Sequence, residues 1–373
     1  MNSEIKIIRE NITPGRRILV TSDIHGHFTH LKEVLNKAAF SSNDLLVIVG
    51  DIIEKGPESL KSLRYVMDLC KTGNVIVLAG NVDMWRLQMI DDINESSAAD
   101  FFNYLLFMRK WYKTSFFDEM TLELGFLTEN STAVLSAKYK ITSLFRTEFD
   151  FLRSLPTVLE TQNYVFVHGG LPESSLHNIS SYNIYNLLKY DDFMSSGLCF
   201  NKYVVVGHWP VTLYGDKKSQ SNPIINKEQK IIFIDGGCGI KDDGQLNLMI
   251  IPDMDCHIDS ISFISHDTFP AFNALTSQDE APDSIHIRWR DNEIKALEKR
   301  DDFTYAEHIS SGRRLWIYNE YLYDDNHCED YTDYTLEVEA GDKLSLIHET
   351  SKGYIVKKNG VTGWYYGELE KSK

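Results

Sequence analysis

The segment RILVTSD (residues 17–23) decides the fold class, because similar strand-like runs recur twice in the residues that follow it. DLLVIVGD (44–51) and NVIVLAGN (74–81) are also short apolar runs that end in a polar residue. Between these runs, HLKEVLNKAAF (30–40) has apolar residues at helical spacing, and SLKSLRYVMDLCK (59–71) predicts a second helix. Short buried strands that alternate with helices predict an α/β domain with a largely parallel first sheet.

The remaining chain predicts four further parts. Residues 91–150, which include DFFNYLLFMRKWY, predict a helical insertion within a first domain that spans residues 1–262. Residues 263–312 have weak periodicity and predict a connector. Residues 313–373 have closely spaced strand patterns and the turn pair Asn359-Gly360, which predict a small all-β barrel. A second, more antiparallel sheet of the first domain is expected from NYVFVHGG, KYVVVGH, KIIFIDGG and QLNLMIIPD.

Composition limits the classes of function. The formal net charge of −16 disfavours strong binding to nucleic acids or to anionic membranes, because the long-range field repels phosphate groups. The five cysteines are scattered and form no CxxC pair, which favours reduced thiols in a cytoplasm. The chain starts without a signal-peptide pattern and has no apolar run long enough to span a bilayer. We therefore expect a cytoplasmic protein without a membrane partner.

Polar residues follow five of the predicted strands, at the ends where ligands bind in open α/β sheets. Imidazole, carboxylate and amide groups together suit zinc, manganese or iron. The candidate ligands are more numerous than one tetrahedral ion needs. They suit two metals that share a bridging carboxylate. A single strand-end residue of this kind is usually a cap or a surface residue, but five such ends in one chain favour a metal site. The residues are Asp23, His25 and His27; Asp51, Glu54 and Lys55; Asn81; His168; and His208.

This arrangement resembles the calcineurin-like metallophosphoesterases, and among them the bacterial serine/threonine phosphoprotein phosphatases. The ordered motifs of that family are G-D-x-H-G, G-D-x-x-D-R-G, G-N-H-E, H-G-G and a late G-H. The chain has SDIHGH, GDIIEKG, GNVD, HGG and GHWPV in the same order, and the resemblance covers roughly residues 17–253. It implies a sandwich of two mixed β-sheets flanked by helices.

The resemblance also implies a ligand set and a mechanism. Asp23, His25 and Asp51 would hold the first metal ion. Asp51 would bridge to the second ion, which Asn81, His168 and His208 would complete. A hydroxide that bridges the metals would attack phosphorus, while the metals neutralise charge on the phosphoryl oxygens. Manganese is the expected ion, and iron or zinc are the alternatives.

The chain departs from the family at its proton donor. Val82 stands where the phosphatases have their general-acid histidine, and Glu54 stands where they have the aspartate that orients it. Lys55 replaces the phosphate-binding arginine and lacks its bidentate fork. Bacterial relatives often have a second arginine in an LLWxR-like stretch, but the nearest match here, LLKYDDF (187–193), has none.

Since a general acid contributes about 10²–10⁴-fold, its loss favours substrates with good leaving groups. We expect phosphotyrosine, aryl phosphates, phosphoanhydrides or phosphodiesters to be hydrolysed better than alkyl monoesters. Asp83 and His27 are the candidate replacement donors. Asp83 could instead cap the helix that follows Asn81.

Two other functions remain open. One is a dinucleoside polyphosphate or other nucleotide hydrolase of the same fold. The other is a catalytically weak phosphate-binding module, although a binding-only site need not keep ligands for both metals. Asp235, in FIDGG, either orients a metal-binding histidine or belongs to a turn.

The tail resembles an SH3-like domain. LYDD precedes TLEVEAGDKLSLI, and KKNGVTGWYYGEL closes the pattern. Such a barrel could bind a Pro-rich peptide through Tyr321, Trp364 and Tyr365, or it could only stabilise the catalytic domain. The expected partners are therefore a phosphorylated protein or small phosphoester as substrate, and a peptide or protein for the tail.

Overall fold

The structure, a computed structural model, describes residues 4–371. The chain divides into two compact units. Unit 1 comprises Met1–Trp209, Pro223–Ile240 and Leu246–His266. Unit 2 comprises Pro210–Asn222, Lys241–Gln245 and Asp267–Lys373. The described residues contain no helix that is long and apolar enough to cross a membrane.

The first sheet of unit 1 contains the three strands predicted from RILVTSD, DLLVIVGD and NVIVLAGN. Its strand order is β12-β11-β2-β3-β4. Strands β2, β3 and β4 are parallel, and Ile18 pairs with Leu45 in the register of the first two. Strands β11 and β12 are antiparallel, so QLNLMIIPD joins this sheet rather than the second one. The strands are β2 (Ile18–Thr21), β3 (Leu45–Ile48), β4 (Val75–Val77), β11 (Leu246–Ile251) and β12 (Ser262–His266).

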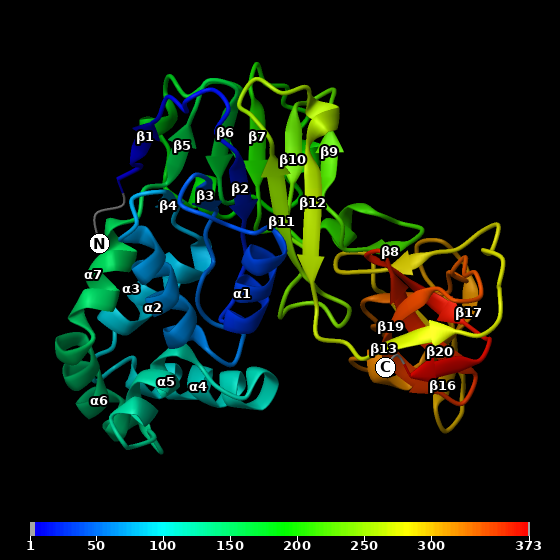
Figure 1. Cartoon of the computed structure of the whole chain (residues 1–373). Coiled ribbons are helices and arrows are strands. Elements are labelled where there is room, and N and C mark those ends of the chain that lie inside the picture. Colours follow the sequence, from blue (N-terminus) through cyan, green and yellow to red (C-terminus); the bar gives the residue numbers. More distant parts are fainter. Residues whose placement is uncertain (1–3, 372–373) are drawn as a thin grey trace. The chain divides into compact units, whose positions relative to one another are not determined.

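Helices between these strands confirm the predicted α/β alternation. Helix α1 (Phe28–Lys37) buries Leu31, Val34 and Leu35, which are spaced to form one face. Helices α2 (Ser59–Cys70) and α3 (Asn81–Asp91) follow strands β3 and β4. Helix α1 packs against β11 and β12, and α2 packs against β4 (Figure 1).

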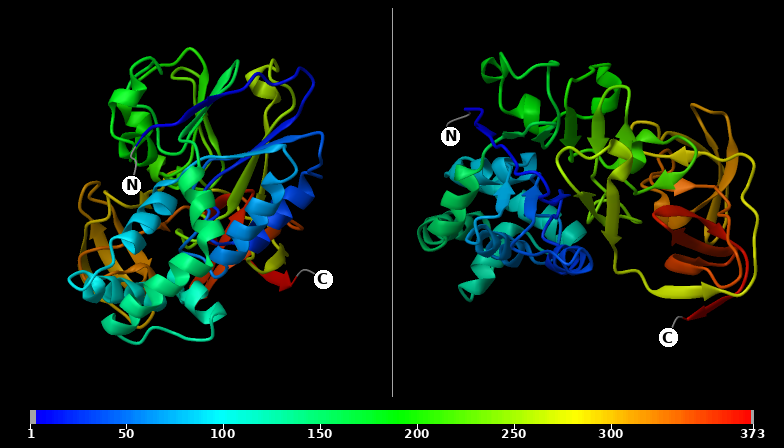
Figure 2. Two further views of the ribbon diagram at one scale, coloured as in Figure 1. Left: turned by 90° about the vertical axis from the view of Figure 1, so that its left-hand side faces the viewer. Right: turned by 45° about the horizontal axis from the view of Figure 1, so that its top comes forward.

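The second sheet of unit 1 is mixed, and its strand order is β1-β5-β6-β7-β10-β9. Strands β6, β7 and β10 are parallel, while β5 and β9 are antiparallel to their neighbours β6 and β10. Apolar residues of both sheets form one core, so the sheets make a sandwich (Figures 1 and 2). The strands are β1 (Ile7–Arg9), β5 (Val158–Glu160), β6 (Tyr164–Val167), β7 (Tyr203–Val206), β9 (Ile224–Asn226) and β10 (Ile231–Phe233).

The predicted helical insertion is present in unit 1. It contains α4 (Ala98–Tyr112), α5 (Phe116–Glu123), α6 (Ser131–Leu144) and α7 (Arg146–Ser154). The short helix α8 (Tyr185–Leu188) and short 3₁₀ turns lie between β6 and β7. The two sheets, the flanking helices and this insertion confirm the predicted fold class.

Unit 2 is all-β and begins earlier than the predicted tail. Residues 267–312, predicted as connector, contribute strands β13 to β16. Their pattern was missed because β15 buries only Ile294 of its six residues, which leaves no visible alternation. The strands are β8 (Ser219–Gln220), β13 (Ala271–Ala274), β14 (His286–Ile287), β15 (Ile294–Lys299), β16 (Phe303–His308), β17 (Arg314–Tyr318), β18 (Tyr331–Thr332), β19 (Lys343–Thr350), β20 (Gly353–Lys358), β21 (Val361–Tyr365) and β22 (Leu369–Lys371).

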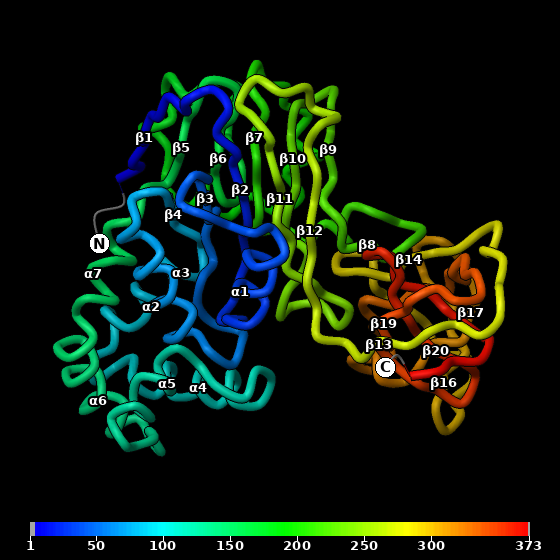
Figure 3. The backbone as a smooth tube through the Cα atoms, in the orientation of Figure 1, coloured from blue at the N-terminus to red at the C-terminus, as the bar shows by residue number. Residues whose placement is uncertain are grey.

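Two short segments from the middle of the chain belong to unit 2. Strand β8 pairs with β21, so the chain leaves unit 1 after β7 and returns as β9 (Figure 3). The largest sheet of the unit has the order β22-β13-β19-β20-β21-β8. The SH3-like identity of the tail stays a prediction.

The aromatic residues predicted to bind a peptide are part of the core of unit 2. Trp364 is 3% exposed and Tyr365 is fully buried. The hydroxyl of Tyr365 donates to the Thr276 carbonyl at 2.7 Å, and that of Tyr321 donates to Asp242 at 2.9 Å. Assigning a peptide surface to these three side chains was therefore wrong, because they fill the interior.

Candidate metal centre

The six predicted metal ligands all follow strands that end at one edge of the sandwich. Asp23 and His25 follow β2, and Asp51 follows β3. Asn81 begins α3 after β4, while His168 and His208 follow the parallel strands β6 and β7. Because parallel strands present their carboxyl ends on the same side, the two sheets bring these six residues together.

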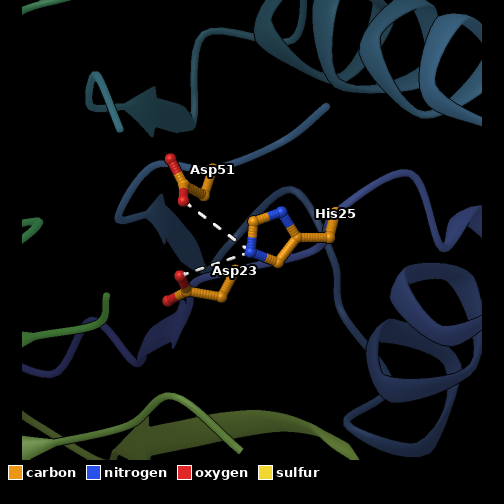
Figure 4. Close-up of side chains that lie close together, drawn as sticks. All are labelled: Asp23, His25 and Asp51. Atoms are coloured by element: carbon orange, nitrogen blue, oxygen red, sulfur yellow. Dashed lines mark ion pairs between the residues drawn. The ribbon is translucent and has the colours of Figure 1, made fainter. Parts of the chain in front are cut away.

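Asp23, His25 and Asp51 form one buried group, whose ligand atoms all lie within 4.8 Å of one another. The Nε2 atom of His25 lies 3.9 Å from Asp23 Oδ1 and 3.7 Å from Asp51 Oδ2 (Figure 4). All three side chains point toward a common centre. This arrangement provides one imidazole nitrogen and two carboxylates for a cation.

Asn81, His168 and His208 form a second group beside the first. The Oδ1 atom of Asn81 lies 2.9 Å from His168 Nε2 and 2.8 Å from His208 Nδ1. Asp51 Oδ2 lies 3.4 Å from His168 Nε2, in addition to its approach to His25. One oxygen of Asp51 therefore lies between the two groups, as a bridging carboxylate requires.

In the neutral form of each of the three histidines, hydrogen bonding places the proton on the ring nitrogen that faces away from the other predicted ligands. His25 Nδ1 faces the Ile53 carbonyl at 3.4 Å, and His168 Nδ1 faces the Val49 carbonyl at 2.7 Å. A nitrogen that faces a carbonyl carries the proton, so the other nitrogen of a neutral ring has a lone pair. In both rings that lone pair points at other acceptors. A bound cation removes this conflict.

The ring of His208 is oriented in a similar way, by a carboxylate in place of a backbone carbonyl. Its Nε2 lies 2.8 Å from Asp191 Oδ1, so the proton lies there and the Nδ1 lone pair faces the Asn81 oxygen. A carboxylate behind a metal-binding histidine fixes the ring and raises its basicity. Sequence reasoning missed Asp191, although it lies in LLKYDDF, the stretch compared with the arginine motif of the relatives.

Unpaired atoms and raised pKa values also fit the binding of cations. Asp23 Oδ1, His25 Nε2 and Asp235 Oδ2 are buried and have no hydrogen-bond partner among residues 4–371. Burial raises the pKa of Asp23 to about 6. Burial alone would lower the pKa of His168, but the charges of Asp51 and Asp23 raise it to about 10. The site thus stabilises added positive charge, and its donor set fits two metal ions.

The backbone at the site is held in unusual conformations. Asp23, His25, Asp51 and His208 all have positive φ, between 47° and 66°. Each such residue costs on the order of 1–3 kcal/mol, and such strain gathers at functional sites. A Cβ atom on Gly80 would lie 2.1 Å from Asp51 Oδ1, so only glycine fits beside the Asp51 carboxylate.

Asp83, a predicted proton donor, instead supports the loop that carries Asp51. Its Oδ2 accepts hydrogen bonds from the backbone N–H groups of Asp51 (2.9 Å) and Gly80 (3.2 Å). Its Oδ1 accepts from Ile52 (2.9 Å) and Ile53 (3.3 Å). Burial and the charge of Asp51 raise the pKa of Asp83 to about 7, but the four N–H groups favour the carboxylate. With both oxygens already accepting hydrogen bonds from the backbone, Asp83 supports this loop.

Asp83→Asn is expected to lower the free energy of unfolding by about 2–4 kcal/mol, because an amide NH₂ would face two backbone N–H donors in a buried place. Urea denaturation of the wild type and the variant measures the change. Asp92→Asn, at the exposed end of the same helix, is the matched control and should have wild-type stability. Unchanged stability of Asp83→Asn, together with a selective loss of activity on basic leaving groups, would restore Asp83 as a donor.

The remaining predicted residues lie close to the ligands. His27 is half-buried, and its Nδ1 lies 2.9 Å from the His25 carbonyl. A neutral His27 therefore carries its proton on Nδ1 and donates it to this carbonyl. Burial lowers the pKa of His27, which favours this neutral form. Burial lowers the pKa of Lys55, although the nearby charges of Asp51, Asp23 and Asp235 act in the opposite direction. Asp235 takes part in a turn, because its Oδ1 accepts a hydrogen bond from the backbone N–H of Gly237 at 2.8 Å.

Glu54 has partners that the sequence did not indicate. It is fully buried, and its Oε1 lies 2.7 Å from Arg86 Nε and 3.0 Å from the Tyr104 hydroxyl. The Arg86 guanidinium also lies over the Tyr104 ring, 4.2 Å from its centroid. Val82 is 5% exposed, and its N–H donates to Asp51 Oδ1 at 2.8 Å. Glu54 is thus paired with Arg86 of α3 and with Tyr104 of the helical insertion.

The chain matches a known protein family over more than half of its length. The family model described as Calcineurin-like phosphoesterase matches residues 16–255. A bis(5'-nucleosyl)-tetraphosphatase, symmetrical, from Buchnera aphidicola subsp. Baizongia pistaciae is 39% identical over 85 residues, which is 22% of this chain and 30% of that protein. The protein of the same name from Photorhabdus laumondii is 36% identical over 85 residues, again 22% and 30% of the two chains. The chain thus spans about a third of the length of the curated relatives it matches.

Similar solved structures include one titled as a putative diadenosine tetraphosphatase. It is 17% identical, with a TM-score of 0.43, and the match covers 71% of this chain and 99% of that one. Another is a protein serine/threonine phosphatase from Saccharomyces cerevisiae, 14% identical, with a TM-score of 0.41 and coverage of 71% and 84%.

Proposed function

The chain belongs to the calcineurin-like phosphoesterase family, and we propose that this metal-dependent hydrolase favours phosphate substrates whose leaving group departs without a proton. The observation that carries the proposal is Val82. It occupies the first turn of α3, directly after Asn81, and its side chain cannot transfer a proton. Asp83, the neighbouring acid, is engaged by four backbone N–H groups.

Two metal ions would be held by the two groups of ligands that share Asp51. Such ions supply Lewis acidity toward phosphoryl oxygens and activate water for in-line attack. Manganese is the expected ion and iron or zinc are alternatives, since imidazole, carboxylate and amide ligands suit all three. The predicted residues are Asp23, His25, Asp51, Asn81, His168 and His208.

The chain's own residues would hold the phosphoryl group and leave the departing group alone. Lys55 would contact a phosphoryl oxygen as a point charge, without the two parallel hydrogen bonds of an arginine. Glu54 is already bound to Arg86 and Tyr104, so it positions these groups rather than a proton donor. Without a proton donor, the rate of hydrolysis falls least for substrates whose leaving groups are weakly basic. Phosphotyrosine, aryl esters, diesters and phosphoanhydrides meet this requirement.

A second candidate is the symmetrical hydrolysis of dinucleoside tetraphosphates. The relatives that are 39% and 36% identical over 85 residues bear that name, which supports this candidate for the part of the chain they match. The chemistry is compatible with Val82, because the leaving group would be a nucleoside diphosphate, an anion of low basicity. Both candidates use the same metal centre.

A substrate panel with manganese tests the proposal. We expect turnover of a phosphotyrosine peptide, bis-p-nitrophenyl phosphate or a dinucleoside tetraphosphate, with loss of activity in EDTA and recovery when manganese is returned. A phosphoserine peptide should be hydrolysed at least about 10²-fold more slowly than the phosphotyrosine peptide. Equal rates on the two peptides would contradict the leaving-group preference. No turnover of any compound by the metal-loaded protein would favour the phosphate-binding module instead.

A further inference from the structure

We propose that Trp85 is a specificity-determining residue that stacks on an aromatic ring in the leaving group of the substrate. This inference rests on the proposed function and extends it, because it gives the enzyme a group that recognises what departs from phosphorus. Trp85 lies on α3, four residues after the predicted ligand Asn81. Nothing in the ligand set or in the metal chemistry makes use of it.

The position of Trp85 on the helix directs it toward the ligands. Residues i and i+4 lie on the same helical face, so Trp85 shares a face with Asn81. Helical side chains lean toward the helix N-terminus, which for α3 is the end that carries Asn81 and Val82. Trp85 is nevertheless 52% exposed, while the neighbours Met84, Arg86 and Leu87 are buried. The indole therefore presents open surface one helical turn from the metal centre.

The opposite wall of this region comes from the segment after β6. The Tyr185 hydroxyl of α8 donates to Gln88 Oε1 at 3.1 Å, which ties that segment to the face of α3 that carries Trp85. Farther along the same segment, Asp191 binds His208. A cavity of about 580 Å³ opens there, lined by Pro172, Asn186, Lys189, Tyr190 and Asp191. This cavity thus borders Asp191, the partner of His208, and lies in the same segment that Tyr185 ties to α3.

The chemistry of this helical turn suits a flat apolar leaving group. Val82 offers neither a proton nor a hydrogen bond to a departing oxygen, so the protein must recognise the leaving group in another way. An exposed indole provides a flat surface on which any aromatic ring can stack. Removal of one aromatic partner of a stacked base weakens binding roughly 10- to 100-fold. Good leaving groups that contain a ring are phenols and nucleoside phosphates. Both kinds of leaving group share the aromatic ring, and the binding test below distinguishes a phenol from a nucleobase.

The kinetic test compares two substrates with good leaving groups, of which only one has a ring. For p-nitrophenyl phosphate, Trp85→Ala should lower kcat/KM by about 10- to 100-fold, mainly through KM. For acetyl phosphate the loss should be at least tenfold smaller. Trp85→Phe should retain most of the preference for the ring. Equal losses on both substrates, or none on either, would overturn the proposal.

Trp111→Ala is the matched control variant. Trp111 is 55% exposed on α4, in contact with the Phe107 ring, and belongs to no part of the proposed site. This variant should keep the wild-type ratio of the two kcat/KM values. A change of that ratio equal to the one in Trp85→Ala would mean that any exposed indole has the effect, and the proposal would fail.

A binding measurement keeps the inference separate from the proposed function. Calorimetry with the manganese-loaded wild type and Trp85→Ala compares phenylphosphonate with methylphosphonate, and adenosine 5′-monophosphate with ribose 5-phosphate. A preference for the ring compound in either pair that disappears in Trp85→Ala supports the proposal, and the pair concerned identifies a phenol or a nucleobase. No such preference in either pair would refute it. If the wild type hydrolysed nothing, the proposed function would fail while this comparison would still decide the role of Trp85.

Discussion

Replacing Asp51 by asparagine is expected to abolish phosphoester hydrolysis, lowering kcat by roughly 10³-fold or more, as expected for the loss of a central electrostatic group. One oxygen of Asp51 lies 3.7 Å from His25 Nε2 and 3.4 Å from His168 Nε2, so it serves both ligand groups. Its other oxygen accepts the Val82 N–H at 2.8 Å, which fixes the carboxylate in this position. The variant would lose the negative charge that holds two cations at once.

The stability of the variant separates a lost ligand from a lost fold. Without metal, the variant should remain folded but be less stable, because the attractions of Asp51 to His168, His25 and Lys55 hold its pKa well below the usual range and outweigh its repulsion of Asp23 and Asp83. Manganese should raise the Tm of the wild type by preferential binding to the folded state, and this rise should disappear in Asp51→Asn. Thermal scans with and without manganese, and metal analysis of the dialysed proteins, measure both effects.

Asp192→Asn is the control for the Asp51 substitution. Asp192 has a φ of 53°, a conformation that asparagine tolerates well, and it is not a predicted ligand. This control should keep both the activity and the rise in Tm. Retention of full activity by Asp51→Asn would refute the two-metal assignment of the site.

The second large effect is expected from Val82→His. In the wild type, phosphotyrosine should be hydrolysed at least about 10²-fold faster than phosphoserine, because only the alkoxide leaving group needs a proton. An imidazole in the first turn of α3 should speed the phosphoserine reaction about tenfold and leave the phosphotyrosine reaction nearly unchanged. We expect a gain below the full range of a general acid because Arg86 and Tyr104 already occupy Glu54, which would otherwise orient the new histidine.

Steady-state kinetics on two peptides that differ only in the phosphorylated residue measure this ratio. Val82→Ala is the matched control, since it opens the same space without adding a proton donor. It should leave the ratio of the two rates unchanged. A wild type that already hydrolyses both peptides equally, or an unchanged ratio in Val82→His, would mean that another group protonates the leaving oxygen.

The fold and the meeting of the six candidate ligands at one edge of the sandwich could be predicted because they depend on local signals. Apolar runs that end in Gly or Ser and a polar residue mark parallel strands and their carboxyl ends, and such ends meet at one edge of the sandwich. The groups that could not be predicted act across long distances in the sequence. Tyr104 reaches Glu54 from the helical insertion, and Asp191 reaches His208 from a separate loop. Spacing and periodicity carry no information about such pairs.

The errors have similar physical causes. Asp83 was a candidate for a proton donor or a helix cap, and the sequence did not indicate its three further N–H partners because they come from a loop that only the folded chain brings near. Residues 267–312 looked like a connector because β13 and β14 are only four and two residues long and β15 exposes five of its six side chains. Trp364 and Tyr365 looked like a binding surface because aromatic residues in a short strand have the same pattern whether they face solvent or fill a core.

The interleaving of the two units has a practical consequence for dissecting the protein. The chain changes unit after residues 209, 222, 240, 245 and 266, and the first of these crossings comes directly after the residue that follows His208. A shortened protein that ends at residue 266 would therefore be no separable catalytic module. It would leave β8 without its partner β21. Residues 210–222, which follow the predicted ligand His208, would then lack the strand against which they pair. Inactivity of such a fragment would reflect this lost pairing, so any role of the tail has to be sought by point substitutions in the intact chain.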